Sequence, residues 1–359
     1  MFFSWHMQGF VRFVAEEQIV DHNFSFFGAL DKFEETMAMS PEEKELFSAS
    51  CFGQFLDHPK ITKSSKIINH LLMRVGDFEG VESDDAIYIE IGGEPRPFTA
   101  KQFAEITGLR YVDDYSPCDV EITDVEGSLF KEIFLGGVVK NRGVLTSMLS
   151  KSKSWENTQK RVKLLLLHFL TNILLAAPAH TPIQNMSWAM LVEDLDEFNK
   201  HPWGNVAWNF FHGQVRKYVM KMASKAESKQ KINFPGFVYP LQVWAYECLP
   251  VLTALKLCQQ VSETAVPLMR RWKTNAHVLD SRLKEINFQD VEFRPLGAEV
   301  EDILPQKKKQ KFKQNHVLSL ASTSTSRSNN DDSRVSTLPS YISTITTTVD
   351  IQVYNLYQL

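Results

Sequence analysis

Residues 164–178, LLLLHFLTNILLAAP, form the strongest apolar run of the 359-residue chain. The run is shorter than the ~20 residues that a helix needs to cross a bilayer, and polar residues, His168 among them, interrupt it. The longer segment from Trp155 to Ala177 is apolar nearly all round after Val162, which is typical of a central buried helix. The sequence therefore favours a core helix over a membrane span.

Amphipathic helices are predicted on both sides of this run. Upstream, Ser40-Pro41-Glu42-Glu43 is typical of a helix start, because Ser can be the N-cap, Pro fits the first helical position and the second Glu can close a capping box. Downstream, apolar residues follow helical spacing from 203 to 222 and from 241 to 257, where Pro250 should kink or end the helix. The first of these two faces comprises Trp203, Ala207, Phe210, Phe211, Val215, Tyr218 and Met222.

A shorter repeat precedes residue 203. Its apolar residues recur every three or four positions and oppose an acidic face, which we interpret as solvated. The apolar residues are Trp188, Leu191, Leu195 and Phe198, and the acidic ones are Glu193, Asp194, Asp196 and Glu197. The sequence His201-Pro202-Trp203-Gly204 then interrupts the helical pattern.

One β-hairpin is predicted among the helices. Ala86–Ile91 reads as a strand, Gly92-Gly93 as a turn and 95–98 as the returning strand. Thr99 is then placed to cap a helix that ends at Gly108, where a left-handed C-cap favours glycine. A loop is expected over 110–126, and short helices near 127–135 and 142–150. The fold class is therefore mainly α: a single helical globular domain with a small β-hairpin element and a disordered C-terminal tail.

Three regions are expected along the chain. Residues 1–39 form a Phe-rich segment of uncertain role without the cationic start of a signal peptide, so the protein is not expected to be secreted. Residues 40–303 form the helical domain. Residues 304–359 form a basic and then Ser/Thr-rich tail, in which 16 of the 30 residues from Ser319 to Thr348 are Ser or Thr. Such a composition buries too little apolar surface to offset the entropy of ordering.

The net charge and the cysteines limit the classes of function that the sequence allows. The formal net charge is −4, but the tail from 306 carries +4, so the remaining body carries −8. An acidic body argues against broad phosphate binding. Cys51, Cys118, Cys248 and Cys258 form no C-x-x-C pair, which argues against a zinc site and is typical of reduced thiols in a cytosolic or nuclear protein.

Several short motifs occur in a fixed order over roughly residues 40–255. They are Phe52-Gly53, Leu71-Leu72-x-Arg74, Phe98-Thr99-x-x-x-Phe103-x-x-x-Thr107-Gly108-Leu109, Leu191-Val192-x-Asp194 with Phe198, Pro202-Trp203-Gly204, and Gly236-Phe237 followed by Leu241, Trp244, Glu247 and Pro250. In order and spacing the chain resembles the plant domain of unknown function numbered nineteen-eighty-five, a family similar to the plant mobile domain. That resemblance implies an origin in the proteins of Mutator-like transposable elements. In those proteins this domain often precedes a SUMO-protease-like domain. It implies no catalytic residues.

No enzyme is expected in this chain. A SUMO protease needs about two hundred residues with His, Asp and a nucleophilic Cys, whereas the 54 residues after Pro305 hold His316 and no Cys. The cysteines at 51, 248 and 258 lie in apolar helical contexts, where cysteine is usually a core residue. His168 is interpreted as a core histidine, and His201 and His212 lack a third metal ligand. We therefore predict no catalytic, cofactor-binding or metal-binding residues, and the sequence implies neither a cofactor nor a small-molecule substrate.

Two basic features are candidates for binding. Arg216, Lys217, Lys221, Lys225 and Lys229 would form a stripe along one helix, which could track a phosphate backbone or contact a partner protein, although an ordinary solubilising face has the same pattern. Lys307, Lys308, Lys309, Lys311 and Lys313 form a flexible cluster that suits a nuclear import receptor, although an inert linker also fits.

The sequence favours an uncharacterised plant, transposon-derived interaction module without catalytic activity. It would be nuclear, with the cytoplasm as the alternative, and would bind an unknown protein partner rather than a membrane. The alternatives are a DNA- or RNA-associating protein that uses the lysine stripe and the basic tail, and a remnant of a SUMO-protease fusion that lacks its protease domain.

Overall fold

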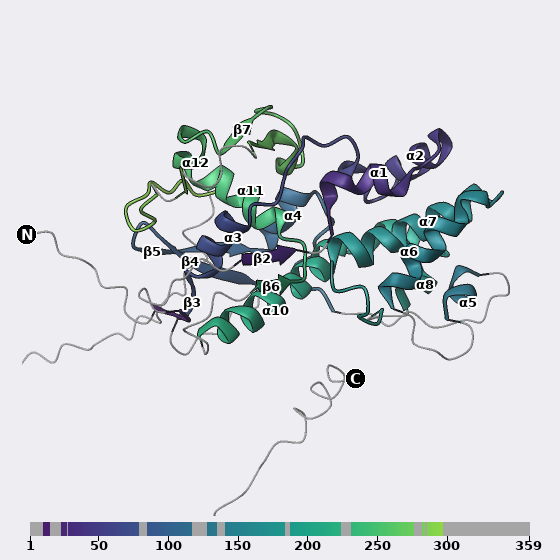
Figure 1. Ribbon diagram of the computed structural model, residues 1–359, viewed down its shortest axis with the longest axis horizontal. Helices are drawn as coiled ribbons and strands as arrows, with labels where there is room; N and C mark the ends of the chain where they lie inside the picture. The colour runs from purple at the N-terminus through teal and green to yellow at the C-terminus, as the bar shows by residue number, and fades with distance from the viewer. Residues whose placement is uncertain are drawn as a thin grey trace, which may run out of the picture. The chain divides into compact units, whose positions relative to one another are not determined.

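The structure is a computed structural model that describes residues 10–14, 23–26, 28–78, 85–116, 128–134, 141–183, 187–223, 231–275, 282–283 and 286–296. All of them fall within the first of two compact units, Met1–Pro305. The predicted tail (304–359) and most of residues 1–27 lie outside the described residues. Twelve α-helices and eight strands occur in the described part of the chain (Figure 1).

The apolar run at 164–178 lies in the core. Helix α7 (Thr158–Phe169) contains its first part, and a π-helical turn (Leu170–Leu174) continues it. Every residue from Leu164 to Ala177 is buried, which confirms the predicted buried helix. Among the described residues, no helix has both the length and the apolar character that a membrane span requires.

A group of short helices surrounds α7 (Figure 1). Helix α2 packs against α7 and begins at the predicted capping box, in which Glu43 N donates to Ser40 Oγ and Ser40 N donates to the Glu43 carboxylate. A buried ion pair between Arg161 and Glu43 then joins the two helices. The group comprises α1 (Phe33–Met37), α2 (Pro41–Ser48), α5 (Leu129–Phe134), α6 (Arg142–Lys151) and α8 (Ser187–Leu191).

A four-stranded antiparallel sheet has the order β1-β3-β4-β5. Its hairpin of β4 (Ala86–Ile91) and β5 (Glu94–Thr99) confirms the prediction, and Gly92 and Gly93 make the turn with φ of 62° and 72°. The strands β1 (Phe10–Arg12) and β3 (Val75–Phe78) were not predicted. The sequence of β3, VGDF, contains two poor strand formers and no alternation, so its pairing is specified by the neighbouring strand rather than by its own pattern.

Two further strand pairs lie outside this sheet. The strand β2 (Asn23–Phe26) pairs in parallel with β6 (Lys231–Phe234), and β7 (Cys258–Gln260) pairs antiparallel with β8 (Trp272–Thr274). The structure therefore has a larger β component than the single hairpin that the sequence predicted.

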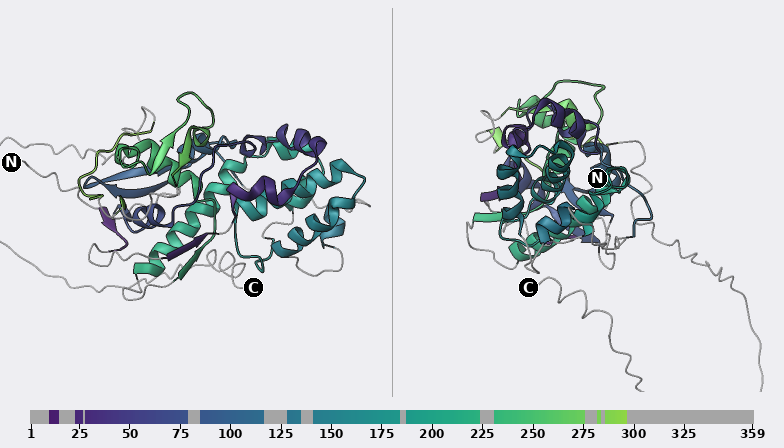
Figure 2. Two further views of the ribbon diagram at one scale, coloured as in Figure 1. Left: turned by 45° about the horizontal axis from the view of Figure 1, so that its top comes forward. Right: turned by 90° about the vertical axis from the view of Figure 1, so that its right-hand side faces the viewer.

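Three of the remaining six helices, α4, α10 and α11, pack against one another beside the sheet (Figure 2) and enclose an aromatic core. Phe98 of β5 is central to it, because its ring lies 5.6 Å from that of Trp208, 6.4 Å from that of Phe103 and 5.7 Å from that of Trp244. The helices are α3 (Ser65–Leu72), α4 (Ala100–Thr107), α9 (Leu195–Lys200), α10 (Trp203–Ala223), α11 (Tyr239–Cys248) and α12 (Pro250–Ala254).

The helix boundaries follow local chemistry. The capping box of Thr99 and Gln102 begins α4, and Gly108 ends it with a φ of 72°, both as predicted. Pro250 starts α12 after a break at Leu249, so the prediction that it kinks or ends a helix is confirmed.

The apolar repeat at 188–198 does not lie on one helix. The chain turns after α8, and Asp194 begins α9 as an N-cap that accepts from the amides of Asp196 (3.0 Å) and Glu197 (3.1 Å). Aspartate is among the strongest N-cap residues, and this preference divides the apolar repeat. The acidic residues also do not form one solvated face, because Glu193 pairs with Lys163 at 2.8 Å.

Segment 286–296 returns to the sheet and the aromatic core. Gly92 N donates to Phe288 O (2.9 Å), and Gln102 Nε2 donates to Leu296 O (3.2 Å). The guanidinium groups of Arg74 and Arg96 lie 4.7 and 4.8 Å from the ring centres of Phe288 and Phe293. The folded unit therefore extends to residue 296.

Candidate functional site

The described part of the predicted lysine stripe lies on α10. Lys217 and Lys221 are exposed and one helical turn apart, and Lys221 Nζ lies 5.8 Å from the ring centre of Tyr218. Lys225 and Lys229 lie outside the described residues. The structure therefore places two exposed charges of the stripe on one face of a helix.

Arg216 does not extend this stripe. Its Nη2 pairs with Asp77 Oδ2 of β3 at 2.6 Å, and both side chains are half-buried. The ion pair neutralises the guanidinium and links α10 to the sheet, so Arg216 contributes to packing rather than to an open cationic surface. The predicted import cluster, Lys307, Lys308, Lys309, Lys311 and Lys313, lies outside the described residues.

Three of the four cysteines are described, and their thiols are poor nucleophiles. Burial raises the pKa of Cys51 and of Cys258 to about 12 and also raises the pKa of Cys248. Because the thiolate is the reactive form, these three side chains stay protonated and unreactive near neutral pH. Cys118 lies outside the described residues.

His168 is buried inside the helical group, as a core histidine would be. Its Nε2 lies 3.2 Å from Thr146 Oγ1 of α6. Burial, with a smaller contribution from the charge of Arg142, lowers the pKa of His168 to about 3. The imidazole is therefore neutral at physiological pH.

The other two candidate histidines each lie against an aromatic neighbour. The His201 ring lies 4.4 Å from that of Trp203, and the His212 ring lies 5.6 Å from that of Trp208. Among the described residues, no group of three or more His, Cys, Asp or Glu side chains is arranged to hold a metal ion.

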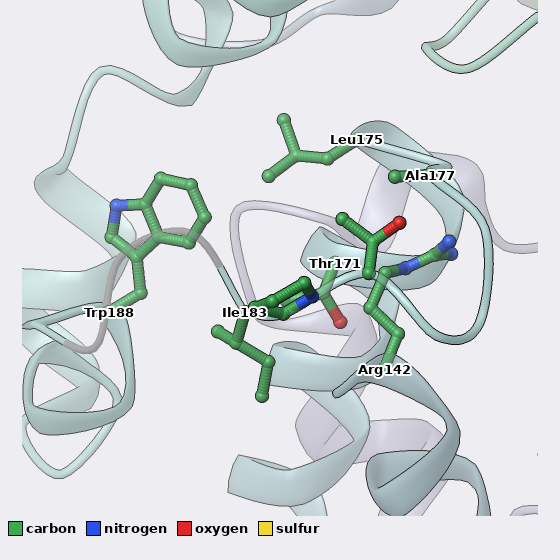
Figure 3. A pocket seen from close by; sticks show the side chains of 8 residues that line it. Arg142, Thr171, Leu175, Ala177, Ile183 and Trp188 are labelled. Carbon is green, nitrogen blue, oxygen red and sulfur yellow. The ribbon is translucent and has the colours of Figure 1, made fainter. Parts of the chain in front are cut away.

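A small cavity of about 10 Å³ lies beside the start of α6 (Figure 3). Arg142 extends from α6 toward Ala177, while Ile183 and Trp188 lie on the other side. The cavity holds roughly one water-sized atom. Its lining residues are Arg142, Thr171, Leu175, Ala177, Thr181, Pro182, Ile183 and Trp188.

Arg142 is the unusual residue of this cavity, because only 7% of it is exposed. Its backbone N donates to Thr181 O (3.2 Å), and Gly143 N donates to Ala179 O (3.0 Å), so the first turn of α6 is fixed to the loop. Within the described residues the guanidinium makes neither an ion pair nor a hydrogen bond, and Nε is buried without a partner. Desolvation lowers the pKa of Arg142 to about 10, so the group still carries its positive charge.

Arg142 was not among the residues predicted from the sequence, although one signal was present. Asn141 is the N-cap of α6, so Arg142 places a cation in the first turn of a helix, where the macrodipole disfavours positive charge. The stability of the helix therefore does not explain why a positive charge occurs at this position.

A second cavity, of about 170 Å³, lies near α1 and is lined by Leu30, Glu34, Phe55, His58 and Lys60. Its carboxylate is already engaged, because Glu34 accepts from Lys44 Nζ at 3.0 Å and from Asp57 N at 2.8 Å. The arrangement stabilises the loop after Phe55 and offers no evident reactive group.

Comparison with known families gives a match over part of the chain. Residues 80–213 match a family described as Domain of unknown function (DUF1985), which confirms the resemblance seen in the motifs. The match includes β4, β5, the helices from α4 to α9 and the first half of α10. No curated protein and no solved structure gave a match.

Proposed function

We propose that this protein is a non-enzymatic interaction module, formed by a single helical domain that comprises the predicted residues 40–303 together with β1, β2 and α1. The exposed face of α10 carries the proposal. Met220 is 48% exposed between Lys217 and Lys221, so an apolar side chain lies in solvent beside two cations. Such a face suits a partner protein that presents an acidic surface with an apolar residue.

The experiment compares proteins retained from a plant nuclear extract. The full chain is tested beside the variant Met220→Glu/Lys221→Glu and a control variant, Val261→Glu/Lys273→Glu, in which an exposed apolar residue and an exposed lysine change near β7 and β8. We expect a specific set of partners to bind the wild-type and control chains and to be lost from the α10 variant. Retention of the same partners by all three chains would contradict the proposal.

The absence of catalysis is supported by the chemistry of the thiols. A cysteine protease needs a thiolate, whereas burial raises the pKa of each of the three described cysteines. We expect no turnover of a SUMO fusion by the full chain. Turnover that disappears on mutating Cys51, Cys118, Cys248 or Cys258 would overturn this proposal. It would instead favour a SUMO-protease fusion that has kept catalytic activity.

Nucleic-acid binding is the second candidate, favoured by the alignment of Lys217 and Lys221 on one helix face. A gel shift with DNA and with RNA at increasing salt tests it. If the stripe contacts phosphates, Lys217→Ala/Lys221→Ala should weaken binding and reduce the steepness of its salt dependence by about 2 units at most. Equal, weak binding by both chains would leave the protein-partner proposal as the better one.

We also propose that the protein is of plant, transposon-derived origin and acts in the nucleus, with cytoplasmic residence as the alternative. The support for this origin is the resemblance of the sequence motifs to a domain that occurs in proteins of Mutator-like elements. The test of localisation fuses the chain to a bulky fluorescent cargo. Changing the five lysines from 307 to 313 to Ala should abolish nuclear accumulation, and an unchanged distribution would remove the basis for this assignment.

A further inference from the structure

The strands β2 and β6 form a separate two-stranded pair beside α10 (Figure 1). The pair is parallel, with Asn23–Phe26 in register with Lys231–Phe234. Parallel strands normally occur in larger sheets that are covered on both faces, and two strands alone are only marginally stable. Among the described residues no third strand continues this pair, so one more strand could be added to it.

The two outer edges of the pair differ. On β2, Lys63 Nζ donates to Phe26 O (3.3 Å), and the strand packs against α3. On β6, half-buried Ile232 and buried Phe234 face the protein, whereas Asn233 is exposed. Successive residues of a strand direct their N–H and C=O groups to opposite edges. Either Ile232 or Asn233 therefore presents both groups on the side away from β2.

The four-stranded sheet shows how an edge of this protein is closed. Ala100 N donates to Asp85 O (2.9 Å), and with the register of β4 and β5 this bond places Pro95 and Pro97 on the side of β5 that faces away from β4. Proline has no N–H, so these residues prevent the addition of a further strand. The sequence of β6, KINF, contains no proline, so its edge keeps its hydrogen-bond donors.

The surface beside the β6 edge is positively charged. The Phe234 ring lies 5.3 Å from the ring of Tyr218, and Lys221 Nζ lies 5.8 Å from the centre of that same ring. Lys217 is exposed one turn before Lys221. An acidic strand would therefore be attracted to this edge, whereas a second copy of the chain would bring like charges together, which is destabilising.

We propose that the open edge of β6 binds an extended, acidic segment of a partner protein as a third strand beside α10. The inference rests on the proposed function, because it names the form in which an acidic partner binds the α10 face. Hydrogen bonds to the backbone of β6 supply affinity that does not depend on the partner's sequence. Carboxylates at every second position of the segment lie on one face and select the acidic class.

The probe for this site is a labelled octapeptide of alternating glutamate and valine, titrated with the full chain and followed by fluorescence anisotropy. One comparison peptide has glutamine in place of glutamate, and another has ester bonds in place of its central amides, so that it lacks their N–H donors. We expect the glutamate peptide to bind at least about tenfold more tightly than either, since each comparison removes two or more interactions.

Each peptide tests one part of the proposal. Equal binding of the ester analogue would overturn strand addition, and equal binding of the glutamine peptide would overturn the selection of an acidic segment. Absence of binding by the glutamate peptide would overturn both. These comparisons use the wild-type chain and do not depend on whether any variant folds.

Variants of the protein locate the binding edge. One of Ile232→Pro and Asn233→Pro removes an N–H from the open edge, and the other removes a bond to β2. The melting temperature identifies the edge-closing variant as the one nearer to wild type. The alanine variant at the same position keeps the N–H and is its matched control. We expect the edge-closing variant to bind the glutamate peptide about tenfold more weakly than its alanine control, and unchanged binding by both proline variants would overturn the proposal.

The edge-closing variant also separates this inference from the proposed function. Nuclear-extract partners that Met220→Glu/Lys221→Glu loses should be lost by this variant as well. If it retains them, the α10 face binds its partner without an added strand, so the inference fails while the proposed function stands. A dimer of the wild-type chain that disappears in the edge-closing variant would assign the edge to a second copy and would also overturn the proposal.

Discussion

At the scale of single residues, two glycines of α10 differ in the space available for a side chain. A Cβ atom on Gly204 would lie 2.6 Å from the carbonyl oxygen of Arg110, whereas a Cβ atom on Gly213 would meet nothing within 4 Å. Gly204 N also donates to that carbonyl at 2.8 Å. The glycine of the Pro202-Trp203-Gly204 motif therefore lets the start of α10 approach the chain after α4.

Substituting these two glycines should have opposite effects. Gly204→Ala is expected to lower the free energy of unfolding by about 2 kcal/mol, because the backbone must move to relieve the contact. Gly213→Ala should raise it by about 0.5–1 kcal/mol, since alanine favours the helix. Urea unfolding of both variants measures these changes. Similar effects at the two positions would show that close approach is not the role of Gly204.

His168 should make stability depend on pH. Its pKa is about 3 in the folded protein and about 6.5 when unfolded, so the unfolded chain takes up a proton that the folded chain does not. Stability from this source is complete above about pH 6.5 and is lost as the pH falls toward 3. Between about pH 7 and pH 5 the loss amounts to about 2 kcal/mol.

The variant His168→Gln isolates this contribution. Denaturant unfolding at the two pH values should show a loss about 2 kcal/mol smaller than in wild-type protein. Burial also lowers the pKa of His201, but that residue is present in both chains and cancels in the comparison. An unchanged pH dependence would mean that the unfolded chain gains no proton at position 168.

At the scale of elements, helix starts depend on single side chains. Asp194 caps α9 through two backbone amides, so Asp194→Ala should lower the free energy of unfolding by about 1 kcal/mol. Asp194→Asn keeps a capping oxygen and should cost much less. Thermal or urea unfolding distinguishes them, and equal losses would assign the effect to charge rather than to capping.

Elements whose signals are local were predictable. The capping boxes at Ser40 and Thr99, the Gly92-Gly93 turn and the break at Pro250 all involve residues within a few positions of one another. The strand pairs β1–β3 and β2–β6 were not, because each joins segments that are far apart in the sequence. The separation of α8 from α9 is not evident in the sequence, because the apolar repeat continues across the turn.

The cavity around Arg142 could not be predicted for a similar reason. Its walls come from α6, from the end of the apolar run and from α8, and only the fold brings them together. The lysine stripe was visible because it repeats within one helix. However, the ion pair of Arg216 with Asp77 depends on the placement of β3 and was not visible.

At the scale of the whole molecule, segment 286–296 should be required for stability. A chain that ends at residue 275 loses the burial of Phe288 and the packing of Phe293 on Trp244, and should be less stable than a chain ending at residue 305 by at least about 3 kcal/mol. The chain ending at 305 should unfold like the full chain, consistent with an expected protease-resistant core ending near residue 300. Urea unfolding compares the three chains, and comparable stability of the two shortened ones would show that the segment contributes little.

The same segment affects the order in which the protein is completed during synthesis. Gln102 leaves the ribosome 194 residues before Leu296, whose carbonyl it binds. At translation rates of about 5–20 residues per second, the hairpin and its aromatic neighbours wait roughly 10–40 s for this partner. During that interval the sheet end is open to chaperones or to self-association, and so is Trp244 from its own synthesis until Phe293 follows it. Slowing of translation near the 3′ end of the coding region should therefore affect yield more than slowing near its start.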